Sequence, residues 1–315
     1  MQKSFNFVGN LKKFAIISCA ILLVGLIASV ILGPKLSINF SGGTKISYSF
    51  TGDINTDDVE AIFKDTIKLE AKADISTDIS GNTKKLNVSL ADNKALSTEQ
   101  IDSLLKALQK KYTDNSVEQV NVQSVSSTAG VKTFVKSLIA VVIAALLILI
   151  YVAIRFRNIG GWTAGLAAIV ALVHDVLIAF IVCVVFRFSI DNNFIAVVLT
   201  LFGYSLNSTI VAFDRIRENR RLNGNSIPLA DLVNDSLSQI LRRTVVTTLT
   251  TFLAIATVAV VAEIMGLTTL RSLTVPMAVG LVSGAYSSVC IAPALWVKWQ
   301  SLRKPKSGKK SRAMV

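Results

Sequence analysis

Charged residues are scarce in this sequence of 315 residues: Asp, Glu, Lys and Arg make up 17% of it, whereas apolar residues make up 52%. A soluble domain needs roughly 25% charged residues to cover its surface with polar groups. Much of this chain must therefore face something other than water. The length leaves room for one membrane-spanning bundle and one modest soluble domain.

Cysteine and histidine are also scarce. The three cysteines, Cys19, Cys183 and Cys290, all lie in apolar runs, form no CxxC pair and have no cluster of histidines and cysteines beside them. This pattern excludes a disulfide framework in an external domain and a cysteine-rich metal site. Small apolar filling is the ordinary role of such cysteines. No nucleophile–base pair or metal-binding cluster stands out, so we expect no enzyme activity, no cofactor and no bound metal.

Six apolar stretches are long enough to cross a bilayer, which takes about 20 residues. The first stretch follows Lys12 and Lys13, as in a secretory signal peptide, but it is long for one and has a poor cleavage site at Ala28-Ser29-Val30. We therefore expect a retained helix and a polytopic α-helical membrane protein with six transmembrane helices. The predicted spans are Phe14–Leu32, Phe134–Ile154, Trp162–Phe186, Phe194–Phe213, Thr244–Ala262 and Leu273–Val297.

The basic residues predict the orientation. With the N-terminus inside, the inner segments carry eighteen Lys and Arg residues, and the two short outer loops carry only Arg187 and Arg271. Such an excess marks cytoplasmic loops. Residues 1–13 and the basic tail, residues 298–315, are therefore predicted to be the cytoplasmic ends of a multi-pass membrane protein.

The net charge of +13 falls almost wholly on the inner face, because residues 33–136 contain equal numbers of basic and acidic residues. A positive inner face attracts anionic lipid. No compact basic domain is present that would bind nucleic acid, so we expect no nucleic-acid partner.

Residues 33–133 are predicted to form an extracytoplasmic domain between the first two spans. The domain contains no His, no Cys and no glycine-rich phosphate loop, which favours a binding or mechanical module over an enzyme. The order of its elements, βαββαβ, is that of an α+β ferredoxin-like domain. The expected elements are strand Thr44–Phe50, helix Asn55–Leu69, strands Ala73–Ile79 and Lys84–Leu90 joined by a turn at Gly81-Asn82, a helix capped by Ser97 and Gln100, and strand Val117–Val125.

Ionisable residues at membrane depth cost roughly 2.5–3.5 kcal/mol each on insertion scales and are therefore candidates for function. Each also has a structural alternative: an acid can cap or pair with a neighbouring helix, threonines can join helices, and arginines can be ordinary inner-face residues. The candidates for ion coupling are His174 and Asp175 in the third span, Asn207 and Ser208 in the fourth, Asp214 at its inner end, and Arg243 and Thr247 at the start of the fifth.

Glycines at GxxxG spacing indicate where helices approach closely. Two such pairs are present, Gly161 with Gly165 and Gly280 with Gly284. The motif alone is common, so it predicts packing and no particular activity.

The run Gly203–Asn219, GYSLNSTIVAFDRIREN, resembles the SecF family, accessory membrane subunits of the bacterial Sec protein-export machinery. Further matching segments follow the order of the family, so the resemblance covers the whole chain. They are Asn39–Thr44 (NFSGGT), Val173–Val176 (VHDV), Arg243-Thr244, and Gly284–Ser288 (GAYSS).

This resemblance implies a fold of the resistance-nodulation-division class, with six spans and an outer domain after the first. It also implies partners: a SecD-type subunit, the SecYEG channel and the translocating preprotein. The pair of subunits is expected to help pull preproteins outward with the ion gradient across the membrane. One charge that crosses 100 mV supplies about 2.3 kcal/mol, so the energy source is adequate.

One position departs from the family pattern. The family usually has Asn-Asp in the fourth span, and that Asp is regarded as a proton relay, whereas this chain has Asn207-Ser208. We favour a relay that rests on a carboxylate of the SecD-type partner, with Asn207, Ser208 and Arg243 as its hydrogen-bonding surroundings. The alternative is a Na⁺ site made of neutral oxygens. Asn39, where the family often has Asp, is a smaller departure.

Two other functions remain open at this point. The first is a scaffold of the translocon that couples no ion, and Ser208 adds weight to that hypothesis. The second is half of an exporter of small molecules or lipids, but such a transporter would need a larger outer domain and a second set of six helices.

Overall fold

Six helices are long and apolar enough to cross a membrane, as the sequence predicts. The structure is a computed structural model that describes residues 5–77, 84–90, 96–224 and 226–303. Three expected features lie outside these residues: the turn at Gly81-Asn82, the end of the strand Ala73–Ile79, and most of the basic tail. The six spans are α1 (Leu11–Leu32), α5 (Ser127–Arg155), α6 (Gly161–Val185), α7 (Asn192–Asn223), α8 (Leu229–Ile264) and the segment Thr268–Leu302.

The sixth span is interrupted near its middle. Helix α9 (Thr268–Tyr286) continues into one π-helical turn, Ser287–Ile291, and then into α10 (Ala292–Arg303). A π-helical turn inserts an extra residue into a helix and changes which side chains face inward.

Several helices are longer than their predicted spans. Helix α7 continues past Phe213 to Asn223, and α8 begins at Leu229, well before Thr244. The apolar stretch marks only the part that lies in hydrocarbon, whereas the flanking polar residues are good helix formers and continue the same helix into water. The short 3₁₀ turn Arg157–Ile159 connects α5 to α6.

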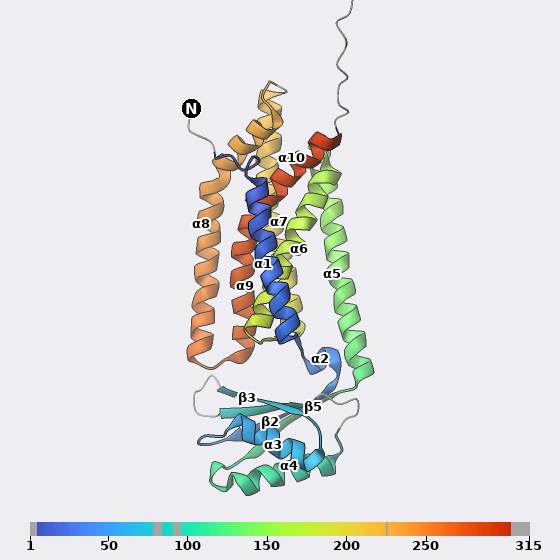
Figure 1. Cartoon of the computed structure of the whole chain (residues 1–315), viewed down its shortest axis with the longest axis vertical. Helices are drawn as coiled ribbons and strands as arrows, with labels where there is room; N and C mark the ends of the chain where they lie inside the picture. Colours follow the sequence, from blue (N-terminus) through green and yellow to red (C-terminus); the bar gives the residue numbers. More distant parts are fainter. Residues whose placement is uncertain (1–4, 78–83, 91–95, 225, 304–315) are drawn as a thin grey trace, which may run out of the picture.

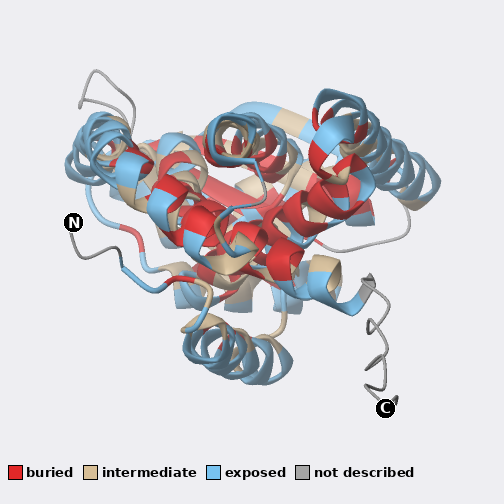
Figure 2. Cartoon of the chain, turned by 90° about the horizontal axis from the view of Figure 1, so that it is seen from above, coloured by how far each residue is buried: buried red, intermediate tan, exposed pale blue. Residues whose placement is uncertain are grey.

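Helices α6, α7 and α9 form the centre of the bundle, and α1, α5 and α8 lie at its edge. Seen from above, the buried residues gather in the middle and the outer helices present mostly exposed surface (Figure 2). Helix α1 packs on α6 in front, while α7 lies behind, between α5 and α8 (Figure 1).

A small α+β domain stands at one end of the bundle (Figure 1). Its antiparallel sheet has the strand order β3-β4-β2-β5, and α3 and α4 cover the face of the sheet that points away from the bundle. The predicted order of strands and helices is present. The elements are β2 (Gly43–Phe50), α3 (Thr56–Ile67), β3 (Ala71–Thr77), β4 (Lys84–Leu90), α4 (Thr98–Lys111), the 3₁₀ turn Thr113–Asn115, and β5 (Glu118–Val125).

Local sequence signals place the two helices of this domain. The side chain of Asn55 accepts a hydrogen bond from the Asp57 amide at the start of α3. Ser97 and Gln100 form the predicted capping box at the start of α4. Alternate residues of β2, among them Tyr48, are fully buried against these helices.

Two links hold the domain to the bundle. Strand β5 leads into α5 with only Ser126 between them, and the short helix α2 (Ile38–Ser41) packs against the start of α5. Gly130 of α5 makes this contact close, because a Cβ there would lie 2.7 Å from the Gly42 nitrogen. The second link is a parallel pair of two-residue strands, β1 (Lys35–Leu36) and β6 (Ser189–Ile190).

Glycines determine how closely the helices of the bundle approach. A Cβ on Gly161 would collide with the carbonyl oxygen of Ala153, and one on Gly280 would lie 2.5 Å from the Leu201 side chain. Gly165 is similar, 2.8 Å from a Leu149 methyl group. Gly203, in contrast, has no atom within 4 Å of the position of its Cβ.

We predict that Gly161→Ala destabilises the protein by about 1–3 kcal/mol, because backbone must move to make room. The matched control is Gly203→Ala, which meets open space and gains helix propensity of about 1 kcal/mol. Unfolding of each variant in mixed micelles measures the difference. Equal stability of the two variants would contradict the close α5–α6 contact.

Candidate functional site

Asp175 lies near the middle of α6 and is fully buried. Three serine hydroxyls from three neighbouring elements donate hydrogen bonds to its carboxylate. Ser205 of α7 and Ser287 of the π-helical turn each lie 2.8 Å from Oδ2, and Ser283 of α9 lies 2.7 Å from Oδ1. We call Asp175 with these three serines the serine cage.

Local sequence explains how α9 reaches the serine cage. A Cβ on Gly284 would lie 3.1 Å from the Ser205 Cβ and 3.5 Å from the Asp175 Oδ2, so the glycine lets the helices approach. The π-helical turn then directs both Ser287 and Ser288 inward, and both are fully buried. Such turns occur often at functional sites.

Hydroxyl groups continue from the cage along the buried face of α7. Ser288 Oγ lies 3.4 Å from Ser205 Oγ and donates to the Ser205 carbonyl oxygen at 3.0 Å. Thr209, one turn further along α7, donates to Ser288 at 2.9 Å. The result is a row of polar groups that leads from Asp175 toward the end of the bundle opposite the α+β domain.

His174 lies on the other side of the carboxylate. Its Nδ1 is 3.1 Å from Asp175 Oδ1 and 3.4 Å from the Ser283 hydroxyl. The ring lies near Tyr286, whose hydroxyl donates to the Phe14 carbonyl oxygen of α1 at 2.9 Å. The two predicted residues of the third span are thus in contact, and His174 is linked through Tyr286 to α1.

The charge of this site is unbalanced. Within the described part of the chain, no Lys or Arg side chain bonds to Asp175, and His174 is the one neighbour able to carry a positive charge. A buried ionised carboxylate without a counter-charge is very costly. The carboxylate and hydroxyl oxygens of the site are the ligands that a small hard cation prefers. No cluster of three or more His, Cys, Asp or Glu residues is found among the residues described.

The structure does not bring the other predicted residues into this site. Asn207 is exposed on the outer side of α7, and the Ser208 hydroxyl donates to the Tyr204 carbonyl oxygen at 3.4 Å. Arg243 and Thr247 are exposed on α8. In the ranges that the structure describes, Asn207, Ser208 and Arg243 make no hydrogen bond with one another.

The predicted contact through threonines is made by other members of the same stretch. Thr244 and Thr248 of α8 are buried, and the Tyr204 hydroxyl of α7 donates to Thr248 Oγ1 at 3.0 Å. Thr247, between these two residues in the sequence, is exposed.

Asp214 lies beyond the membrane-buried part of α7. Its carboxylate pairs with Arg155 of α5 at 3.1 Å and with Arg217, one turn later in α7, at 2.8 Å. Asp214 therefore joins two helix ends and has no contact with Asp175.

Sequence reasoning missed Ser205 and Thr209 as members of the site. Their spacing of four residues places them on one face of α7, so the sequence does indicate that the two side chains lie together. Nothing in the sequence of α7 alone distinguishes that face from the one that carries Gly203 and Asn207. The buried face is defined only by the packing of α6 and α9.

Comparisons with known proteins agree on one family. The family described as "Protein export membrane protein SecD/SecF, C-terminal" matches residues 104–302. Protein translocase subunit SecF of Sebaldella termitidis is 34% identical over 307 residues, which cover 96% of this chain and 95% of that protein. Protein translocase subunit SecDF of Bacillus subtilis is 32% identical and is matched by 95% of this chain over 38% of its own length.

A solved structure has the same fold. The crystal structure of SecDF, a translocon-associated membrane protein from Thermus thermophilus, superimposes with a TM-score of 0.77 at 29% identity. The match covers 95% of this chain and 39% of the SecDF chain.

We predict that Ser287→Ala destabilises the protein by about 1 kcal/mol, because it removes a buried hydrogen bond to the carboxylate within the membrane. Ser208→Ala is the matched control and should change stability little, since that hydroxyl bonds only to its own helix. Unfolding in mixed micelles measures both. A larger loss of stability for Ser208→Ala would show that the serine cage does not hold these helices together.

Proposed function

The chain belongs to the SecD/SecF family of protein-export membrane proteins, and from this we propose that it uses the transmembrane ion gradient to assist the outward movement of preproteins. Its membership in this family of translocase subunits gives it a role in protein export, and its six spans make it a multi-pass membrane protein. The other partners we propose are the SecYEG channel, the translocating preprotein and anionic lipid at the inner face.

The proposed orientation places both termini in the cytoplasm and the α+β domain outside. The strong excess of Lys and Arg on the inner segments supports it. We propose that the outer domain is ferredoxin-like, in agreement with its βαββαβ order and its antiparallel sheet.

A SecD-type subunit is the proposed direct partner. Relatives named SecDF are longer, and this chain matches only 38–40% of their length. The name SecDF joins SecD and SecF in one protein. A second membrane half is also what a pseudo-symmetric transporter requires.

The face of α7 and α8 that carries Asn207, Arg243 and Thr247 is the proposed contact for this partner. These polar side chains are exposed in helices that cross the membrane. Polar and charged groups that face lipid are costly, and small residues such as Gly203 permit close helix contact. Helices of the partner that carry polar side chains would form hydrogen bonds with this face.

Helix α7 connects this contact face with the serine cage. Within one turn, Ser205 and Thr209 point to Asp175 and Ser288, while Asn207 points outward and Ser208 bonds to Tyr204. This two-sided turn is the observation that supports ion coupling. We propose that the relay carboxylate belongs to the partner, with Asn207, Ser208 and Arg243 around it, and that Asp175 is the second acid, inside this chain.

A scaffold that couples no ion is the alternative function. The complete set of hydrogen bonds around Asp175 favours it, because a carboxylate held by three hydroxyls suits a static structural role. The half-exporter of small molecules gains no support, since the relatives are named as protein translocase subunits.

The export experiment uses vesicles that contain this chain, its SecD-type partner and the channel. It follows the outward movement of a stalled substrate with and without a proton or sodium gradient. We predict that Arg243→Ala loses most of the gradient effect, because a cation beside a relay carboxylate favours its ionised form. Ser208→Ala, the control, should keep that effect, since serine cannot exchange a proton near neutral pH.

Two outcomes would contradict this reading. If Asp175→Asn abolishes the gradient effect in a protein that still folds while Arg243→Ala keeps it, the relay lies within this chain. If no variant changes the response and no gradient stimulates export, the scaffold is the correct function.

We also predict that the chain co-purifies with its SecD-type partner in mild detergent, and that Gly203→Leu removes most of the partner. The added side chain meets open space in the isolated chain but fills the proposed contact face. Ala20→Leu, an exposed position on α1, is the control and should leave co-purification unchanged. Equal recovery of the partner with both variants would show that it binds another face.

A further inference from the structure

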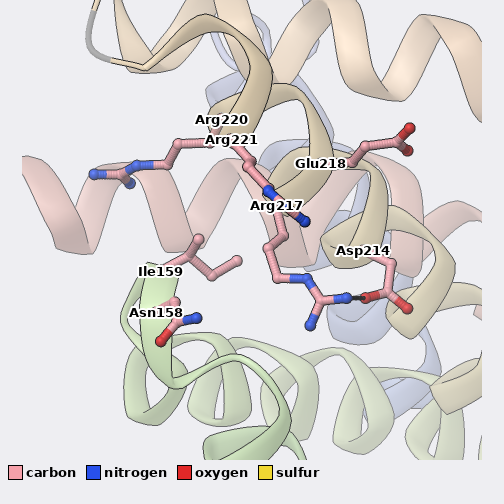
Figure 3. Close-up of a pocket in the computed structure, with 7 residues that line it drawn as sticks. All are labelled: Asn158, Ile159, Asp214, Arg217, Glu218, Arg220 and Arg221. Atoms are coloured by element: carbon pink, nitrogen blue, oxygen red, sulfur yellow. Dashed lines mark ion pairs between the residues drawn. The ribbon is translucent and has the colours of Figure 1, made fainter.

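A pocket of about 710 Å³ lies at the end of the bundle opposite the α+β domain (Figure 3). Asn158 and Ile159, from the turn between α5 and α6, line one side. The last turns of α7 line the other side, from Asp214 to Arg221. Of the candidates for ion coupling, only Asp214 lines this pocket.

The acidic residues of this pocket are already neutralised. Asp214 pairs with Arg155 and Arg217, at 3.1 and 2.8 Å. Glu218 pairs with Arg215 at 2.7 Å. Neither carboxylate is therefore available as a counter-charge for a further cation.

Arg220 and Arg221 complete the lining without an acidic partner in the part of the chain that the structure describes. In Figure 3, the side chains of Arg220 and Arg221 lie away from the ion pair between Arg217 and Asp214. Arg220 is half-buried, so its charge is removed in part from water. The pocket thus has two guanidinium groups that can accept an anion, and Asn158 adds an amide.

The depth of the pocket identifies the surroundings of that anion. Helix α7 starts at Asn192 and rises 1.5 Å per residue, so Asp214 lies roughly 33 Å and Arg220 roughly 42 Å along it. The hydrocarbon core of a bilayer is about 30 Å thick. Arg220 and Arg221 therefore lie roughly 12 Å beyond the hydrocarbon core, at the bilayer surface, from where their long side chains can reach back to the headgroups.

The end of α5 beside the pocket carries an exposed apolar side chain. Ile154 is 67% exposed and precedes Arg155, which pairs with the pocket residue Asp214. The Phe156 ring is fully buried and lies under Arg155 and Arg217, with each guanidinium carbon 5.8 Å from the ring centre, so it offers no surface to a ligand. An acyl chain would contact Ile154, whereas a free inorganic anion would make no use of it.

We propose that this pocket binds the phosphate group of an anionic phospholipid, held by Arg220 and Arg221, with the acyl chains along the end of α5. One guanidinium group can bind two oxygens of a phosphate at once, because its N–H donors form a planar fork. Basic pockets between membrane helices on the cytoplasmic side are suited to such headgroups. The site gives a location to the anionic lipid proposed above and rests on the proposed orientation, which places this end of the bundle at the cytoplasmic surface of the bilayer.

The test measures lipid binding to the purified chain in mild detergent by native mass spectrometry. Phosphatidylglycerol, phosphatidylcholine and inorganic phosphate are titrated separately. We expect one tightly bound phosphatidylglycerol, weakened at least about tenfold in the double variant Arg220→Gln/Arg221→Gln, because this variant removes charge-assisted hydrogen bonds to the phosphate. The assay needs no export activity, so failure of the proposed function would not affect it.

The control variant is Lys12→Gln/Arg242→Gln, which removes the same charge from exposed positions of the same end but outside the pocket. It should weaken binding less than about twofold. Arg220→Lys/Arg221→Lys keeps the charge without the planar fork and should give an intermediate affinity. An unchanged unfolding midpoint shows that each variant is folded.

Three results would overturn the proposal. Equal weakening by the two glutamine variants would show diffuse attraction instead of a site. Equal affinity for phosphatidylcholine would show that the charge of the headgroup is not recognised. Inorganic phosphate that competes at the same concentration as phosphatidylglycerol would assign the pocket to the free anion.

Discussion

One buried carboxylate determines how the centre of this bundle is assembled. Helices in lipid gain little from apolar contact with one another, so hydrogen bonds and close packing must select their arrangement. Asp175 receives hydroxyl donors from α7, α9 and the π-helical turn, and each donor fits only when the three helices are in register. Any sliding or rotation of one helix leaves a donor or the acid without its partner in a medium that offers no water.

The glycines make this arrangement possible. Gly284 lets α9 approach the serine cage, and Gly161 lets α6 approach the backbone of α5. Close contact between α6 and α9 then determines which face of α7 is buried. As a result, the polar residues on the outer face of α7, such as Asn207, point away from Asp175.

The sequence predicts the elements of the fold well, because they depend on local patterns. Apolar length defines the six spans, alternation defines the strands, and Asn55 and Ser97 define helix starts by capping. The site is predicted only in part. Asp175 was recognised from its type and depth, but Ser205 was not, because no periodicity in α7 marks its inward face. The π-helical turn that directs Ser287 inward arises from tertiary packing and has no sequence signature of its own.

The junction between β5 and α5 has a mechanical consequence. Only Ser126 separates the strand from a helix of 29 residues, roughly 43 Å long. Helix α2 packs against Gly130 and stiffens that junction, whereas the opposite link is a pair of two-residue strands with the Arg187 guanidinium bonded to the Gly33 carbonyl oxygen. Helix α5 is thus a lever arm with the sheet fixed to its tip. A tilt of about 10° about the far end of α5 would sweep the edge of the sheet through roughly 7 Å, about the length of two extended residues.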